Sequence, residues 1–98
     1  MPVARVFKSS WFAKAARKAR IADAELCKAI AQVTAGQTDD LGGGVFKKRL
    51  GGNRYRSIIL ARGGSYWVYT YLFAKQDKAN IDEGELKVFR GIANQYSK

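Results

Sequence analysis

The first third of the chain places apolar residues at helical spacing after a short extended run. The run Val3–Lys8 predicts a strand, because apolar and β-branched residues dominate it. A helix is predicted to begin at Ser9 or Ser10, either of which can cap it, and to end near Arg20. The apolar stripe expected to be buried on this helix comprises Trp11, Phe12, Ala15 and Ala19.

A second helix is predicted from a cap at Asp23 to about Ala35, with Gly36 in the left-handed conformation that commonly follows a helix. Its apolar stripe comprises Leu26, Ile30 and Val33. Cys27 lies beside this stripe and is interpreted as a core residue rather than a reactive thiol. The segment 37–44 ends in consecutive glycines and is interpreted as a flexible loop leading into a sheet.

The middle of the chain changes to the short apolar runs and glycine-containing turns of β-structure. Strands are predicted over Val45–Leu50, Arg54–Ala61 and Ser65–Phe73. The third is rich in aromatic and β-branched residues, which favours a central strand covered on both faces. A terminal helix is predicted from about Asp82, because Asp82 and Glu85 have the spacing of a capping box. This order of elements predicts an α+β fold with a helical hairpin on one side of a small sheet.

Length and composition limit the alternatives. The 98 residues fit a single domain, 1–98, with one modest core. The formal net charge of +10 favours a polyanionic partner. A lone cysteine fits a reducing compartment. Basic residues interrupt every apolar run near the N-terminus, and no run approaches membrane-spanning length, so a cytoplasmic protein without a membrane partner is expected.

The segment 45–56 carries five cations and no carboxylate, which makes it the main candidate for chemistry. Lys47 and Arg49 alternate along a strand and therefore share one face. If the turn Gly51-Gly52-Asn53 sets the expected register, Arg56 approaches that face. Lys75 follows the next strand at a margin of the sheet. Four cations are thus predicted to converge on one concave region.

Such a cluster suits a phosphodiester group. Cleavage of RNA by its own 2′-hydroxyl builds negative charge on the phosphate oxygens, and fixed cations stabilise it. The chain has no histidine, so a lysine would have to act as acid or base, and spacing alone favours phosphate binding over cleavage. Common zinc and Ser/His/Asp patterns are impossible, and no metal or cofactor is expected. The acidic pairs Asp39-Asp40 and Asp82-Glu83 are interpreted as solvated residues of a loop and a helix start.

At these residues the chain resembles the RelE/ParE superfamily of bacterial toxins. The motifs, in order, are Lys47-Lys48-Arg49-Leu50-Gly51, Tyr55-Arg56 and Phe73-Ala74-Lys75. The resemblance is greatest to the HigB-like branch, through the start Val6-Phe7-Lys8-Ser9-Ser10-Trp11-Phe12, the glycine run after Leu41, and Asn80-Ile81. It spans roughly residues 5–96 and implies a small antiparallel sheet with an N-terminal helical hairpin and a C-terminal helix.

The resemblance implies the toxin of a type II toxin–antitoxin pair. RelE-like toxins enter the ribosomal A site and cut mRNA there, leaving a 2′,3′-cyclic phosphate and a 5′-hydroxyl. The implied partners are the ribosome with its mRNA and a cognate helix-turn-helix antitoxin, with operator DNA bound only through the antitoxin complex. The implied catalytic residues are Lys47, Arg49, Arg56 and Lys75. Further residues predicted to contact RNA or the ribosome are Lys14, Arg17, Lys18, Lys48, Arg54, Tyr55 and Lys78.

Departures from the family pattern leave the general base and acid open. RelE-type toxins carry an arginine where this chain has Gln76, and a tyrosine near the position of Asp82. Lys47 is the first choice as base, followed by Lys75. Tyr96 supplies a hydroxyl only if the last helix folds toward the site. The rival interpretations are a ParE-like gyrase inhibitor, a non-catalytic nucleic-acid-binding module and a decayed toxin that binds only its antitoxin.

Overall fold

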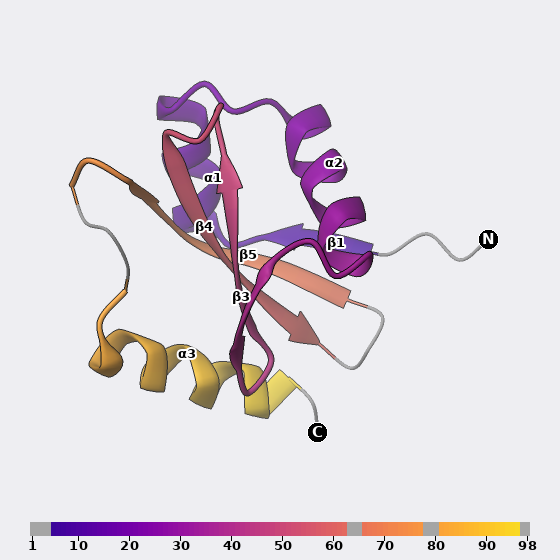
Figure 1. Cartoon of the computed structure of the whole chain (residues 1–98), viewed down its shortest axis with the longest axis vertical. Helices are drawn as coiled ribbons and strands as arrows, with labels where there is room; N and C mark the ends of the chain where they lie inside the picture. The colour runs from indigo at the N-terminus through magenta and orange to yellow at the C-terminus, as the bar shows by residue number, and fades with distance from the viewer. Residues whose placement is uncertain (1–4, 63–65, 78–80, 97–98) are drawn as a thin grey trace.

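The computed structural model describes residues 5–62, 66–77 and 81–96. In them the chain forms three helices and five strands (Figure 1). They are β1 (Arg5–Lys8), α1 (Ser10–Lys18), α2 (Asp23–Thr34), β2 (Asp39–Gly42), β3 (Val45–Leu50), β4 (Tyr55–Arg62), β5 (Tyr66–Ala74) and α3 (Glu83–Tyr96). The predicted α+β class is confirmed. None of these helices is long and apolar enough to cross a bilayer.

The five strands form one sheet in the order β1-β5-β4-β3-β2. The pairs β2–β3, β3–β4 and β4–β5 are antiparallel, whereas β1 pairs with β5 in parallel. The sheet is therefore mixed, and only its larger part is antiparallel as expected. The parallel pair arises because the helical hairpin α1–α2 and the strands β2–β4 separate β1 from β5 along the chain.

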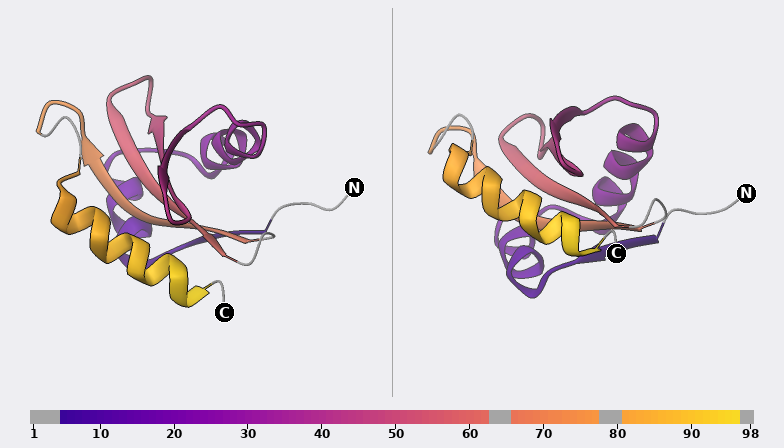
Figure 2. Two further views of the ribbon diagram at one scale, coloured as in Figure 1. Left: turned by 60° about the horizontal axis from the view of Figure 1, so that its bottom comes forward. Right: turned by 90° about the horizontal axis from the view of Figure 1, so that it is seen from below.

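Helices cover both faces of the sheet, so each face has its own core (Figure 2). The first core lies between the sheet and the helices α1 and α2, where Phe12 stacks on Tyr69 with ring centroids 4.8 Å apart. Tyr69 also donates a hydrogen bond to the carbonyl of Leu26, at 2.8 Å. The second core lies beneath α3 and includes Val45, Ile58, Leu60, Phe73, Ile81 and Ala93.

The predicted helix-capping residues are right in two of three cases. The Ser9 side chain accepts a hydrogen bond from the Phe12 amide and caps α1. Asp82 and Glu85 form the reciprocal capping box of α3, with hydrogen bonds of 2.7 and 3.2 Å. Asp23 does not cap α2, because it is the first residue of the helix and forms an ion pair with Lys8.

Two burial predictions are wrong. Trp11 is 52% exposed, and Ala16 is buried in its place beside Phe12. Trp11 lies in the first turn of α1 and stacks on Tyr71 of β5. Cys27 is exposed, because it is one residue past the buried stripe of α2 and faces outward.

The segment 37–44 is not the flexible loop expected from its glycines. It contains β2, and α3 packs against its glycines. Arg90 of α3 donates hydrogen bonds to the carbonyl oxygens of Leu41 and Gly42. A Cβ on Gly43 would lie 2.9 Å from Cγ of Arg90, and a Cβ on Gly44 would lie 3.3 Å from Cβ of Ala93. Only glycine allows the terminal helix to pack this closely on the backbone.

Candidate phosphate-binding site

Strand pairing brings three of the predicted cations onto one face of the sheet. Arg49 of β3 lies directly opposite Arg56 of β4, and Lys47 lies opposite Ile58 on the same face. Directly opposed residues have Cβ atoms about 5 Å apart, and diagonal neighbours are about 7–8 Å apart. This register agrees with the shared face expected from the Gly51-Gly52-Asn53 turn. It is the α3 side of the sheet, because Ile58 belongs to the core beneath that helix.

Arg56 is the most enclosed of these cations, with 9% of the residue exposed. Its Nη1 donates hydrogen bonds to the carbonyl oxygens of Asn53 and Tyr55, at 3.1 and 3.2 Å. Within residues 5–62, 66–77 and 81–96, no carboxylate forms an ion pair with it, and no side-chain nitrogen or oxygen is buried without a partner. The other guanidinium N–H groups therefore reach solvent, where they can bind an anion.

Arg56 marks the point where the α3 side of the sheet changes from core to open surface. Phe73 lies opposite Arg56 on β5 and is buried beneath α3. Ile58, the next residue of β4 on this face, is fully buried. Arg56 therefore has packed side chains on one side and solvent on the other. A rigidly held cation in a partly desolvated position binds an anion more strongly than a freely moving surface residue does.

Lys47 has a partner that sequence patterns did not reveal. Asp39 is its cross-strand partner on β2, and Oδ2 of Asp39 lies 3.7 Å from Nζ of Lys47. The Lys47 side chain is 15% exposed and that of Asp39 is 65% exposed. The 3.7 Å separation is long for an ion pair and Asp39 is exposed, so a phosphate can replace the carboxylate as the partner of Lys47.

The prediction for Asp39-Asp40 is right about exposure and wrong about the element, because both residues are exposed but lie in a strand and not in a loop. Asp39 lies in β2 beside the cations, and Oδ1 of Asp40 accepts a hydrogen bond from the Gly42 amide. No local signal predicts β2, because its sequence is two aspartates, a leucine and a glycine. Only its pairing with β3 makes it a strand.

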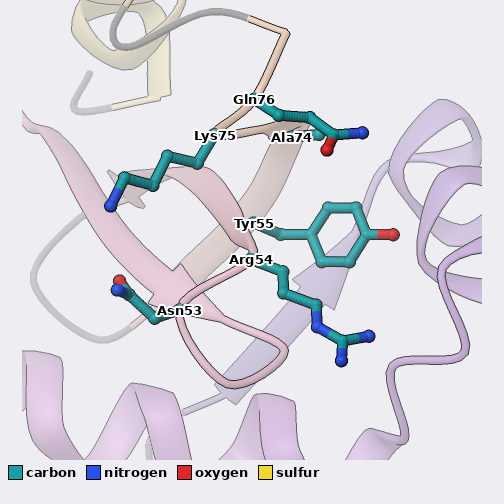
Figure 3. A pocket seen from close by; sticks show the side chains of 6 residues that line it. All are labelled: Asn53, Arg54, Tyr55, Ala74, Lys75 and Gln76. Carbon is teal, nitrogen blue, oxygen red and sulfur yellow. The ribbon is translucent and has the colours of Figure 1, made fainter.

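Lys75 lies at the end of β5, where its amide donates a hydrogen bond to the carbonyl of Arg54. Figure 3 shows the Lys75 and Asn53 side chains on one side of this strand pair, and Arg54, Tyr55 and Gln76 on the other. Tyr55 packs against the core of the α1–α2 side. Lys75 therefore points to the side that carries Arg56. A hollow of about 650 Å³ is lined by six residues, namely Asn53, Arg54, Tyr55, Ala74, Lys75 and Gln76.

Arg54 and Arg56 lie on opposite sides of this strand pair, although alternation along the predicted strand Arg54–Ala61 would place them on one face. Arg54 belongs to the turn before β4, so the alternation of the strand does not extend to it. Lys48 faces the α1–α2 side, where its ammonium group donates a hydrogen bond to the carbonyl of Gln37. Lys14, Arg17 and Lys18 are exposed on α1, away from the Arg56 side. Lys78 and the Tyr96 side chain lie outside the described residues.

Taken together, these features define a small α+β protein whose sheet carries fixed cations at the rim of a core. The family described as the RelE toxin of the RelE/RelB toxin–antitoxin system matches residues 4–98. The chain belongs to this family and is therefore the toxin of a toxin–antitoxin system, with an antitoxin as its partner. No curated protein and no solved structure matches the chain. Toxins of this family are generally endoribonucleases, whereas assignment to the HigB-like branch stays a prediction.

Proposed function

We propose that this toxin is a ribosome-dependent endoribonuclease that cuts mRNA in the A site. The observation that carries the proposal is the opposition of Arg49 and Arg56 beside Lys47 on a single face of the sheet. Among the described residues Asp39 forms an ion pair with Lys47, whereas no carboxylate forms one with Arg49 or Arg56, so both guanidinium groups are available to an anion. A phosphodiester with two free oxygens accepts hydrogen bonds from both guanidinium groups at once.

The proposed reaction is attack of the mRNA 2′-hydroxyl on the neighbouring phosphorus. The 2′-oxygen loses its proton and bonds to phosphorus, the bond to the 5′-oxygen breaks, and that oxygen takes up a proton. The products are a 2′,3′-cyclic phosphate and a 5′-hydroxyl. Arg49 and Arg56 stabilise the charge that develops on the phosphate oxygens, which is usually the largest single contribution to such catalysis. Lys75 supplies a proton to the leaving oxygen.

Two groups beside the phosphate can accept the proton of the 2′-hydroxyl, Lys47 and Asp39. A carboxylate accepts a proton at neutral pH directly, whereas an ammonium group must first lose one. Two other carboxylates near these strands are engaged: Glu25 accepts a hydrogen bond from the Gly51 amide and Asp40 from the Gly42 amide. We therefore assign the base to Asp39 and a charge-stabilising role to Lys47.

The site alone does not explain why cleavage would need the ribosome. The exposed cations of α1, Lys14, Arg17 and Lys18, lie outside the phosphate site and supply a second basic surface for ribosomal RNA. This activity places the toxin in the cytoplasm. The antitoxin is proposed to be a helix-turn-helix protein that carries the toxin to operator DNA.

Induced expression tests the proposal. Wild-type toxin is expected to stop growth and protein synthesis within minutes, with chromosomal DNA intact and mRNA cut inside translated codons. Arg56→Gln should lose these effects although it accumulates to the same level. DNA breaks with intact mRNA would instead indicate a gyrase inhibitor. Undisturbed growth would indicate a binding module or a decayed toxin.

A further inference from the structure

The second half of β5 has a strand on only one side. β1 pairs with β5 from Tyr66 to Tyr69, and the chain then turns away into α1. Ser9 closes this junction, since its amide and its hydroxyl donate to the carbonyl oxygens of Tyr69 and Thr70. From Tyr71 to Ala74 the pairing continues with β4 alone. Among the residues that the structure describes, no strand covers this edge.

Backbone groups on this edge point outward at every second residue. The Lys75 amide donates to Arg54 of the β4 side, whereas the Ala74 carbonyl points away from β4 and accepts from the Asp77 amide. By the alternation of antiparallel pairing, the amide and carbonyl of Leu72 and the amide of Ala74 also point away from β4. No described residue bonds to these three groups. They match the donors and acceptors of one further strand.

A groove of about 420 Å³ runs along this edge, with α1 as its opposite wall. The wall is low because Ala15 of α1 and Ala19, the residue that caps the C-terminus of α1, line it. At one end stands Trp11, which is half exposed and stacks on Tyr71 with ring centroids 4.9 Å apart. An indole this exposed beside unpaired backbone groups is the surface expected of an interaction site.

The charge of the surroundings indicates the chemistry of the partner. Exposed Lys14, Arg17 and Lys18 project from α1, which has no acidic residue in its first turn, and Lys18 lines the groove. Among the described residues that line the groove, Asp77 is the single acidic one. An acidic segment therefore fits better than a basic one. An RNA strand would bring negative charge but not the alternating amide and carbonyl groups that match the edge.

We propose that an extended acidic segment of the antitoxin adds to the sheet as a strand on β5, with an apolar side chain packed beside Trp11. The partner's identity rests on the proposed function. The groove lies on the α1 side of the sheet, whereas Arg56 faces the α3 side. The antitoxin would then cover the basic surface of α1 without needing the phosphate site.

Hydrogen exchange of the purified toxin tests this proposal, with the protein encoded by the neighbouring reading frame as the probe. In the complex the amides of Leu72 and Ala74 should exchange at least 10-fold more slowly than in free toxin. The substitution Ala74→Pro removes one outward N–H and leaves the pairing with β4 intact, so it should weaken binding at least 10-fold. The matched variant Ala74→Ser keeps that N–H and should bind normally.

A second pair of variants tests the charge. Lys18→Glu in the groove should weaken the complex, whereas Lys28→Glu on α2 should not. Arg56→Gln should bind the neighbouring protein as tightly as wild type does. Unchanged exchange of Leu72 and Ala74 in a tight complex would overturn the proposal and leave the nuclease function standing. Absence of any complex with wild-type toxin would also overturn this proposal, whereas the nuclease function is tested separately by induced expression.

Discussion

Arg49 and Arg56 are directly opposed across the β3–β4 pair, so two like charges occupy one cross-strand position. Opposed like charges cost a sheet roughly 0.2–1 kcal/mol. An anion bound between the two guanidinium groups would remove this repulsion. The pair therefore opposes stability, and the proposed phosphate site gives it a function.

Replacing one of the two arginines should separate stability from activity. Arg49→Gln is expected to raise the free energy of unfolding by roughly 0.2–1 kcal/mol, because it removes the repulsion. Cleavage should nevertheless fall by about 100-fold or more, because a charge that stabilises the transition state is lost. Urea unfolding and single-turnover cleavage measure the two effects. Lys28→Gln removes a charge from α2 instead and should change neither.

Asp39 should be required for cleavage but not for binding. Asp39→Asn keeps the shape and removes the carboxylate beside Lys47, so cleavage is expected to fall by roughly 10²–10⁴-fold. RNA retention on the variant should stay equal or increase, because one negative charge is gone. Asp40→Asn is the matched control, since it makes the same change at the neighbouring residue, which contacts the Gly42 amide. Equal cleavage by Asp39→Asn and wild type would reject the assignment of the base.

The docking of α3 should depend on the glycines before β3. Gly43 has a φ of +65°, and a Cβ there would lie 2.9 Å from Cγ of Arg90. Gly52 has a φ of +62° with no heavy atom within 4 Å of the same position. Gly52→Ala should therefore cost only the backbone strain of about 1–2 kcal/mol. Gly43→Ala should cost a further ~1–3 kcal/mol, because Arg90 must move. Chemical denaturation of the two variants measures the difference, and equal losses would contradict this role of Arg90.

Tyr69 should make stability depend on alkaline pH. Burial raises the pKa of its hydroxyl, which donates to the Leu26 carbonyl. Because the pKa is higher in the folded state, this contribution is complete below about pH 10, where an unfolded tyrosine titrates. It is lost as the pH rises further. Tyr69→Phe is expected to cost about 1 kcal/mol at pH 7 and less above pH 10, as shown by thermal unfolding. Tyr55→Phe serves as the control, and a loss that does not change with pH would contradict this account.

Periodic segments of the chain predicted their elements well. The strand Val45–Leu50 has the predicted ends, and α1, α2 and α3 begin within a residue or two of their predicted starts. The shared face of Lys47, Arg49 and Arg56 followed from strand alternation and a two-glycine turn, both of which are local signals. The local sequence likewise predicts the capping residues Ser9 and Asp82.

Features that depend on partners distant in the chain were not predictable in the same way. β2 is a strand only because β3 pairs with it, so the local sequence around Asp39 predicts a loop. The parallel pairing of β1 with β5 joins segments about 60 residues apart, which no local pattern reveals. Trp11 has the spacing of a buried residue, but the free edge of β5 leaves it half exposed.

Cleavage of mRNA on ribosomes stalled with one defined codon in the A site tests the central claim most directly. The measurement compares wild-type toxin and Arg56→Gln on two messages, one natural and one with a single 2′-deoxynucleotide at the cut position. We predict one cut by wild-type toxin in the natural message, with a 2′,3′-cyclic phosphate end, and none in the other three combinations. Cleavage of the 2′-deoxy message, or undiminished cleavage by Arg56→Gln, would contradict the account.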